Sequence, residues 1–200
     1  MPLHLYLIRH GETAWARSGR HTGCTDIPLT AHGEAEARAL GRQLRDLPFA
    51  RVLTSPLRRA RQTCGLSGLA HVPEVEPDLA EWDYGDYEGR RSAEIRQERA
   101  DWDIFRDGCP HGAMPAHVAA RADRLIARLR LLDGNVARFS HGQFGGVLAA
   151  RWLGLPVVEA RHFPLDTASC SIFGLSPHHP AVPVIALWNA VAGDRFASAS

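Results

Sequence analysis

Short apolar runs alternate along the chain with longer segments in which apolar residues recur every three or four positions. The runs predict β-strands at residues 3–8, 51–54, 135–140, 169–175 and 182–188, with a short extended piece at 72–79. The helical spacing predicts one helix that starts at Thr30 and others at residues 55–64, 92–106, 116–132 and 143–153. The tail after Ala192 shows neither pattern and is expected to be mobile.

Strands and helices in this order are typical of an α/β fold, in which a mostly parallel central sheet carries helices on both faces. Two hundred residues with 45% hydrophobic content can bury one substantial core. No Ser/Gly-rich or charge-dense linker divides the chain. Residues 1–200 are therefore expected to form a single domain.

The first strand ends abruptly in Arg9, His10 and Gly11, and a later strand ends in His141 and Gly142. Sheets of this class bind their ligands beyond the carboxyl ends of the strands, so these groups are expected to meet at one edge. Arginine carries a fork of donors that matches phosphate or carboxylate in shape. The local pattern by itself predicts an anion site that contains an imidazole.

The composition and charge of the chain argue against several classes of partner, location and mechanism. The formal net charge is +1, with no concentrated basic stretch, which argues against a nucleic-acid or acidic-membrane partner. No apolar run approaches the ~20 residues needed to span a bilayer, and no signal-like start precedes the first strand, so a cytoplasmic location is expected. The four cysteines are scattered without a C-x-x-C pair, so neither a metal site nor a disulfide framework is expected. All 23 basic residues are arginine, which excludes lysine Schiff-base, pyridoxal phosphate and P-loop mechanisms.

Several segments together resemble the histidine phosphatase superfamily, also called the phosphoglycerate mutase-like family. These are Leu7-Ile8-Arg9-His10-Gly11-Glu12-Thr13, the loop at residues 22–30, Ser55-Pro56-Leu57-Arg58-Arg59-Ala60, the aromatic and acidic segment at residues 81–89, and Ser140-His141-Gly142. They occur in the order that the family shows, across about residues 5 to 153.

The resemblance implies a metal-free and cofactor-free phosphoryl transfer. His10 takes the phosphoryl group while Glu81 protonates the departing alcohol, and water activated by Glu81 then hydrolyses the phosphohistidine. Arg9, Arg59 and His141 hold the phosphate, with His141 expected to act as a cation. Further phosphate or substrate contacts are expected from the helix that follows His141 and from a group of loop residues, namely Thr13, His21, Thr22, Gly23 and Gly142. A small helical insert at about residues 90–115 is expected to cover the site.

Three alanines depart from the family pattern. Many relatives carry Asn at the position of Ala16, Arg at Ala80 and Glu at Ala113, so the departures leave substrate recognition open. The segment at residues 82–89, together with residues 105–109, is similar to the branch that contains sedoheptulose-bisphosphatase-like enzymes. That branch implies a sugar phosphate or bisphosphate as substrate. A bisphosphoglycerate-dependent mutase and a catalytically silent phospho-ligand binder remain alternatives, and the sequence leaves a homodimer open.

Overall fold

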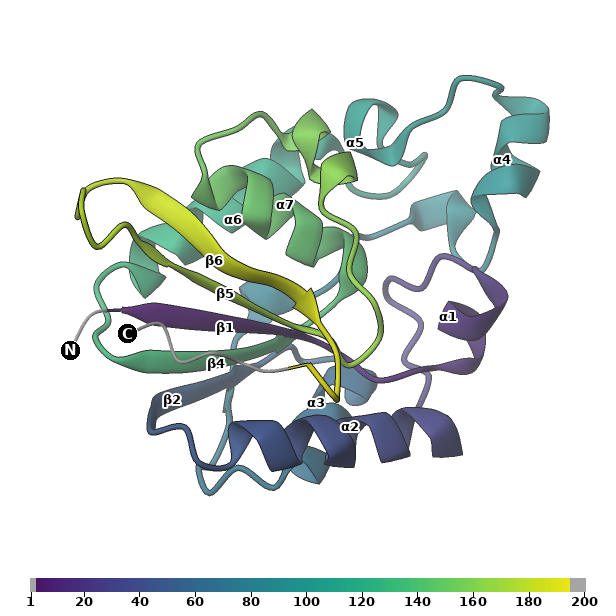
Figure 1. Cartoon of the computed structure of the whole chain (residues 1–200). Helices are drawn as coiled ribbons and strands as arrows, with labels where there is room; N and C mark the ends of the chain where they lie inside the picture. Colours follow the sequence, from purple (N-terminus) through teal and green to yellow (C-terminus); the bar gives the residue numbers. More distant parts are fainter. Residues whose placement is uncertain (1–2, 195–200) are drawn as a thin grey trace.

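A computed structural model describes residues 3–194, and in that range the strands form one six-stranded sheet in the order β3-β2-β4-β1-β5-β6 (Figure 1). The strands are β1 (His4–Arg9), β2 (Phe49–Thr54), β3 (Glu74–Val75), β4 (Asn135–Ser140), β5 (Cys170–Leu175) and β6 (Pro183–Ala190). The first four pair in parallel, whereas β5 runs antiparallel to β1 and β6 antiparallel to β5. The predicted mostly parallel sheet is confirmed.

Helices cover both faces of the sheet, as the sequence predicted. Helices α2 (Ala31–Leu44) and α3 (Arg58–Ser67) lie on one side, and α6 (Pro115–Leu129) and α7 (Gly142–Trp152) lie on the other (Figure 1). Alternate residues of β1 explain the two layers, because Tyr6 and Ile8 belong to the core beneath α2 and α3, whereas Leu5 and Leu7 belong to the core beneath α7. The central strand is therefore apolar on both of its faces.

Shorter elements gather beyond the end at which β1 finishes (Figure 1). They are α1 (Ala14–Ser18), α4 (Ser92–Glu98), α5 (Ile104–Asp107) and the 3₁₀ turns η1 (Pro77–Leu79), η2 (Gly85–Tyr87) and η3 (Val157–His162). The predicted helix at residues 92–106 is two helices, because buried Trp102 lies between them and Asp103 starts a new helix by accepting the Phe105 N–H at 2.9 Å. Residues of both helices and of the segment between them lie over the edge of the sheet at which β1 ends.

Two local expectations at helix starts had different outcomes. Thr30 caps α2 as predicted, since its hydroxyl accepts the Gly33 N–H at 3.0 Å. Ser55 does not start α3, which begins at Arg58 instead. The Ser55 hydroxyl accepts both from His141 Nε2 and from the Leu57 N–H at 3.3 Å, so it closes a turn before the helix, and Leu57 takes the capping position. The expected mobile tail after Ala192 falls mostly outside the described residues.

Candidate active site

The carboxyl ends of three neighbouring strands bring the predicted histidines together. The His10 N–H donates to the Ser140 carbonyl at 3.0 Å, and the Ser55 N–H donates to the Phe139 carbonyl at 2.9 Å, so β1, β4 and β2 end side by side. The rings of His10 and His141 lie 5.2 Å apart between centroids, in an edge-to-face arrangement. Two histidines separated by 131 positions in the sequence thus share one edge of the sheet.

The tautomer of His10 follows from the one hydrogen bond that its ring makes among the described residues. Nδ1 lies 2.7 Å from the Gly11 carbonyl oxygen, and because a carbonyl can only accept, Nδ1 carries the proton. Nε2 is left with a lone pair. Burial, reinforced by the guanidinium groups of Arg9 and Arg59, holds the pKa of His10 well below its ordinary value of 6.5. The neutral ring is therefore oriented and competent to act as a nucleophile at physiological pH.

His141 is held in the opposite tautomer. Arg59 Nε donates to His141 Nδ1 at 3.2 Å, so the Nε2 atom carries the proton and donates to the Ser55 hydroxyl at 2.7 Å. Burial and the charge of Arg59 hold the pKa of His141 well below 6.5. In this structure His141 is therefore a neutral ring, because it is buried against a guanidinium group that supplies the positive charge; a cationic His141 against a bound phosphate stays a prediction.

Arg59 is fully buried and shapes the loop in front of it. Its terminal nitrogens donate to the carbonyl groups of Thr22 at 2.9 Å, Gly23 at 3.0 Å and Thr25 at 3.1 Å. The side chain thereby fixes the loop while its charge lies close enough to His10 and His141 to lower both pKa values. In this arrangement Arg59 acts on the site through its charge and through the loop it orders.

Arg9 keeps a donor free for a ligand. One of its terminal nitrogens donates to the Leu165 carbonyl, whereas its buried Nε has no hydrogen-bond partner among the described residues. The second terminal nitrogen, Nη2, also makes no hydrogen bond among the described residues, and because Arg9 lines the cavity, this nitrogen can donate to an anion there. Arg9 is therefore well suited to clamp a phosphate next to His10.

Glu81 lies against the first turn of α7. One of its carboxylate oxygens accepts the N–H groups of Trp82 at 2.8 Å and Phe144 at 2.7 Å, and the other accepts the Gln143 N–H at 3.0 Å. These bonds fix the orientation of the carboxylate. They also mean that Gln143 and Phe144 do not offer their N–H groups to a phosphate, contrary to the expectation for this helix, because the carboxylate already uses the positive end of the helix.

A cavity of about 620 Å³ opens at this edge of the sheet. Six of the predicted site residues line it, namely Arg9, His10, His21, Thr22, Glu81 and Gly142. Arg59 and His141 are buried and are not among the lining residues. Thr13 and Gly23 do not line the cavity either. The Thr13 hydroxyl caps α1 by accepting the Ala16 N–H at 3.1 Å, and the Gly23 N–H donates to the Glu88 carboxylate at 2.8 Å.

His21 joins the first loop to the helical insert. Its ring stacks on Tyr84 at 4.6 Å between centroids and meets Trp102 edge-on at 5.5 Å, while Nε2 lies 3.1 Å from the Ser92 hydroxyl. Burial, aided by the charge of Arg96, lowers the pKa of His21 from 6.5 to about 4. The ring is thus a neutral part of the cavity wall.

Sequence reasoning missed two residues that support the site. Arg121 of α6 donates to the carbonyl groups of Asp78 at 3.2 Å and Glu81 at 3.1 Å, and its guanidinium lies 4.1 Å from the centre of the Phe144 ring. No local signal marks it, since its hydrogen bonds span 40 positions or more. Ser55 could have been found, because it directly follows a strand, as His10 and His141 do.

Two kinds of feature are absent from residues 3–194. In that range no three or more His, Cys, Asp or Glu side chains are grouped so that they could hold a metal ion. None of the helices there combines the length and the apolar character needed to cross a bilayer.

Comparison with known proteins places the chain in a family. Residues 5–190 match the profile of the histidine phosphatase superfamily (branch 1). The chain is 42% identical over 174 residues to an acid phosphatase of Mycobacterium tuberculosis, with 85% of each chain covered. It is 36% identical over 183 residues to a sedoheptulose 1,7-bisphosphatase of Saccharomyces cerevisiae, an alignment that covers 76% of this chain and 68% of the yeast protein.

A solved structure agrees with the sequence comparison. The solved structure of the protein encoded by an open reading frame of Mycobacterium tuberculosis superposes on this chain with a TM-score of 0.89. The two chains are 38% identical, and the superposition covers 94% of this chain and 98% of the other. The chain therefore belongs to the histidine phosphatase superfamily, as its sequence motifs predicted.

Proposed function

We propose that this protein is a phosphomonoesterase that hydrolyses a small phosphorylated metabolite, a sugar phosphate or bisphosphate, through a phosphohistidine intermediate. The observation that carries the proposal is the state of His10, which is neutral, oriented through Nδ1 and placed at the cavity beside Arg9. The acid phosphatase and the sedoheptulose bisphosphatase among the relatives support this class of reaction and substrate.

The first step is an in-line displacement at phosphorus. The Nε2 lone pair of His10 forms a P–N bond while the ester P–O bond breaks, and Glu81 delivers a proton to the departing oxygen. In the second step Glu81 takes a proton from water, whose oxygen attacks phosphorus as the P–N bond breaks, releasing phosphate and restoring His10. Arg9 binds the phosphate oxygens, and the charge of Arg59 favours the dianion and keeps His10 neutral.

A phosphate-release screen tests the proposal directly. Wild type, His10→Ala and a control variant, His32→Ala, are given an aryl phosphate and a set of sugar mono- and bisphosphates. His32 is exposed on α2 and lies outside this cavity. We expect wild type and the control to release phosphate and His10→Ala to lose roughly 10³-fold or more. Mass spectrometry after a rapid quench should find the phosphoryl group on His10.

Other outcomes separate the alternatives. Activity retained by His10→Ala removes this residue as the nucleophile. Isomerisation of 3-phosphoglycerate that depends on bisphosphoglycerate, without phosphate release, identifies a mutase. Binding of phosphate esters without turnover of any of them identifies a silent relative. We further propose that the enzyme works in the cytoplasm, where its four free cysteines would stay reduced.

A further inference from the structure

The loop that forms one wall of the cavity is paired with the segment at residues 88–91, which leads into the insert. The His21 N–H donates to the Arg90 carbonyl at 2.9 Å, and the His21 carbonyl accepts the Gly89 N–H at 2.9 Å. Residues 20–22 of this loop line the cavity. The segment at residues 88–91 therefore sets where this part of the wall lies.

Glu88 holds the same loop by its N–H groups. Its Oε1 atom accepts the Gly23 N–H at 2.8 Å and the Thr25 N–H at 3.0 Å, and its Oε2 atom shares the Gly23 N–H at 3.0 Å. A Cβ at residue 23 would lie 2.8 Å from Oε2 of Glu88 and 2.4 Å from the Trp82 carbonyl oxygen. Glycine at this position is thus what lets the loop approach the carboxylate so closely.

Arg59 holds the loop from the other side, by its carbonyl groups. Its Nη2 atom donates to the Thr22 carbonyl at 2.9 Å. The Thr22 carbonyl and the Gly23 N–H belong to one peptide group, which accepts from Arg59 at its oxygen and donates to Glu88 at its nitrogen. Because a peptide group is planar, it cannot turn at one end alone. The positions of the guanidinium and the carboxylate are therefore linked through a single peptide group.

The side chains at the two ends of this link carry opposite charges. Hydrogen bonds to charged groups are the stronger ones, and bonds that follow one another in a chain polarise each other. Burial lowers the pKa of Arg59, and the charges of Glu81 and Glu88 are among those that oppose this shift. Glu88 thus favours the charged state of an arginine that acts on both His10 and His141.

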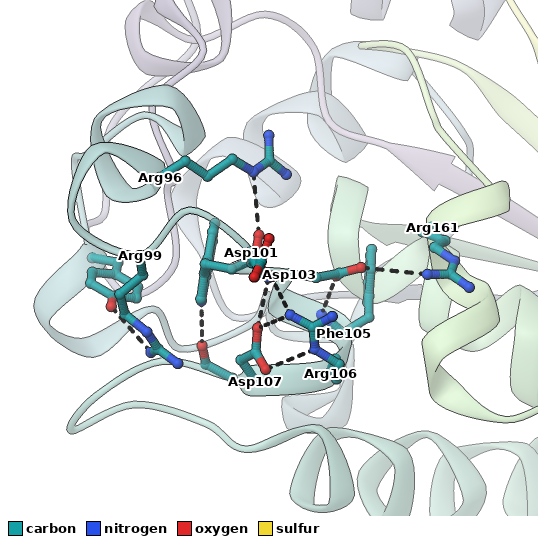
Figure 2. A network of polar contacts seen from close by, with 11 residues as sticks. Arg96, Arg99, Asp101, Asp103, Phe105, Arg106, Asp107 and Arg161 are labelled. Atoms are coloured by element: carbon teal, nitrogen blue, oxygen red, sulfur yellow. Dashed lines mark hydrogen bonds and ion pairs between the residues drawn. The ribbon is translucent and has the colours of Figure 1, made fainter.

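The segment that carries Glu88 is braced by the insert. Arg99 of α4 donates to the Tyr87 hydroxyl at 3.4 Å, and the Tyr87 ring meets Trp102 edge-on at 5.3 Å between centroids. Around these residues the acidic and basic side chains of the insert bind one another (Figure 2). Since Tyr87 directly precedes Glu88, the carboxylate lies on a segment that is fixed independently of the loop.

We propose that Glu88 is a positioning residue of the active site, which acts on the reacting phosphate through Arg59 by way of the peptide group between Thr22 and Gly23. The inference rests on the proposed function, in which the charge of Arg59 favours the phosphate dianion. Glu88 does not line the cavity and has no direct role in the reaction. It keeps the loop, and with the loop the guanidinium, in one place.

A double-mutant cycle between Glu88 and Arg59 tests the proposal. Glu88→Gln keeps one acceptor oxygen but loses the charge, and it should lower kcat/KM by about threefold or more. Glu88→Met accepts no hydrogen bond from the loop and should lower kcat/KM by about tenfold or more. Both losses should vanish in the Arg59→Gln background, where the guanidinium is absent. A residue that only stabilises the fold would lower kcat/KM by the same factor in both backgrounds.

Glu98→Gln is the matched control, because Glu98 is an exposed carboxylate of α4 that pairs with Arg90 outside the cavity, and its kcat/KM should equal that of wild type. The melting temperature of every variant is measured, and if Glu88→Met does not fold, the cycle is completed with Glu88→Gln. Wild-type kcat/KM in Glu88→Gln, or a loss that persists undiminished in the Arg59→Gln background, would overturn the inference.

The same cycle is measured a second time as affinity for inorganic phosphate, by calorimetry. The losses of affinity in the Glu88 and Arg59 variants should again be non-additive. If no ester releases phosphate while the cycle for inorganic phosphate stays non-additive, the result counts against the proposed function alone. If esters are hydrolysed and the losses add, the result overturns the inference alone.

Discussion

Arg59 Nε donates to His141 Nδ1 over 3.2 Å, and this bond sets the charge of the second histidine. Because a guanidinium can only donate, the ring nitrogen that faces it must be unprotonated. The positive charge beside the two rings is therefore that of a permanently charged arginine. An imidazolium in the same place would lose its charge as the pH rises through its pKa, whereas the guanidinium stays charged throughout the physiological range.

The first prediction concerns the pH dependence of catalysis. Since the pKa of both His10 and His141 lies well below 6.5, both rings stay neutral as the pH falls from 7 toward that lower range. The acid-side fall of kcat/KM should therefore lie well below pH 6.5 in wild type. Removing the nearby charge in Arg59→Gln should raise the pKa of His10 and move the fall toward higher pH.

Arg58→Gln is the control for that profile, because Arg58 is the exposed neighbour of Arg59 on α3. The same substrate is used for all three proteins, so that titration of its own phosphate cancels in the comparison. A wild-type fall centred near pH 6.5 would show that His10 is not held neutral by its surroundings.

The second prediction concerns stability below neutral pH. His21 has a pKa of about 4 in the folded protein and about 6.5 in the unfolded chain, so only the unfolded chain binds a proton between these values. The free energy of unfolding should therefore fall as the pH drops below 6.5, with His21 contributing about 3 kcal/mol of the loss by pH 4. His21→Phe, which keeps a ring against Tyr84, should show a shallower decline in urea unfolding. His117→Phe, at an exposed position of α6, should decline as wild type does.

The third prediction tests how Glu81 is positioned. Arg121 holds the carbonyl groups on either side of this residue, so Arg121→Met should loosen the carboxylate and lower kcat by about tenfold. The loss should be larger for an alkyl phosphate than for an aryl phosphate, because only the poor leaving group depends on a proton from Glu81. Arg124→Met is the matched control on the same helix, because the exposed Arg124 side chain pairs with the Asp78 carboxylate and does not contact Glu81, and it should leave both rates unchanged. An equal loss on both substrates would assign Arg121 a structural role only.

The parts of the site that could be predicted are those encoded by local sequence. Arg9, His10 and His141 lie where apolar runs of the sequence end. Because such runs predict strands, the ends of these strands can be located from the sequence alone. The use of Glu81 by the N–H groups of α7, and the neutral state of His141, could not be read this way. Both depend on contacts between segments about 60 to 80 positions apart.

The start of α3 shows how a local rule is overridden. Serine followed by proline is a strong signal for a helix start, yet Ser55 bonds to His141, and Leu57 takes the capping position without a side-chain bond. The residues between β2 and α3 thus include Ser55, which contacts His141.

The fourth prediction concerns the turn that follows the nucleophile. A Cβ at residue 11 would overlap the Gly33 carbonyl oxygen, which is backbone and cannot turn aside, and the Gly11 carbonyl is also the acceptor that orients His10. Gly11→Ala should therefore lower both the melting temperature and kcat. Gly65→Ala is the matched control, since nothing lies within 4 Å of its Cβ in α3, and it should stabilise the protein by about 0.5–1 kcal/mol. A Gly11→Ala variant with normal melting and activity would show that the β1 and α2 backbones can separate without harm.

The last prediction concerns Arg138, which lies fully buried in the central strand β4. Its guanidinium donates to the Leu5 carbonyl at 3.2 Å and lies 5.0 Å from the centre of the Phe173 ring, but two of its nitrogens, Nε and Nη1, have no partner among the described residues. Burial lowers the pKa of this arginine to about 9, so the charged form is unfavourable in the folded protein.

Arg138→Met should therefore raise the free energy of unfolding by about 1–4 kcal/mol and leave kcat/KM unchanged, since the residue does not line the cavity. The advantage should shrink above pH 9, because folded wild type then releases the proton that the unfolded chain still holds, which stabilises wild type relative to the variant. Arg128→Met, at a surface ion pair, should change stability by less than about 0.5 kcal/mol. A destabilised Arg138→Met would mean that the bond to Leu5 and the contact with Phe173 together outweigh the burial of the charge.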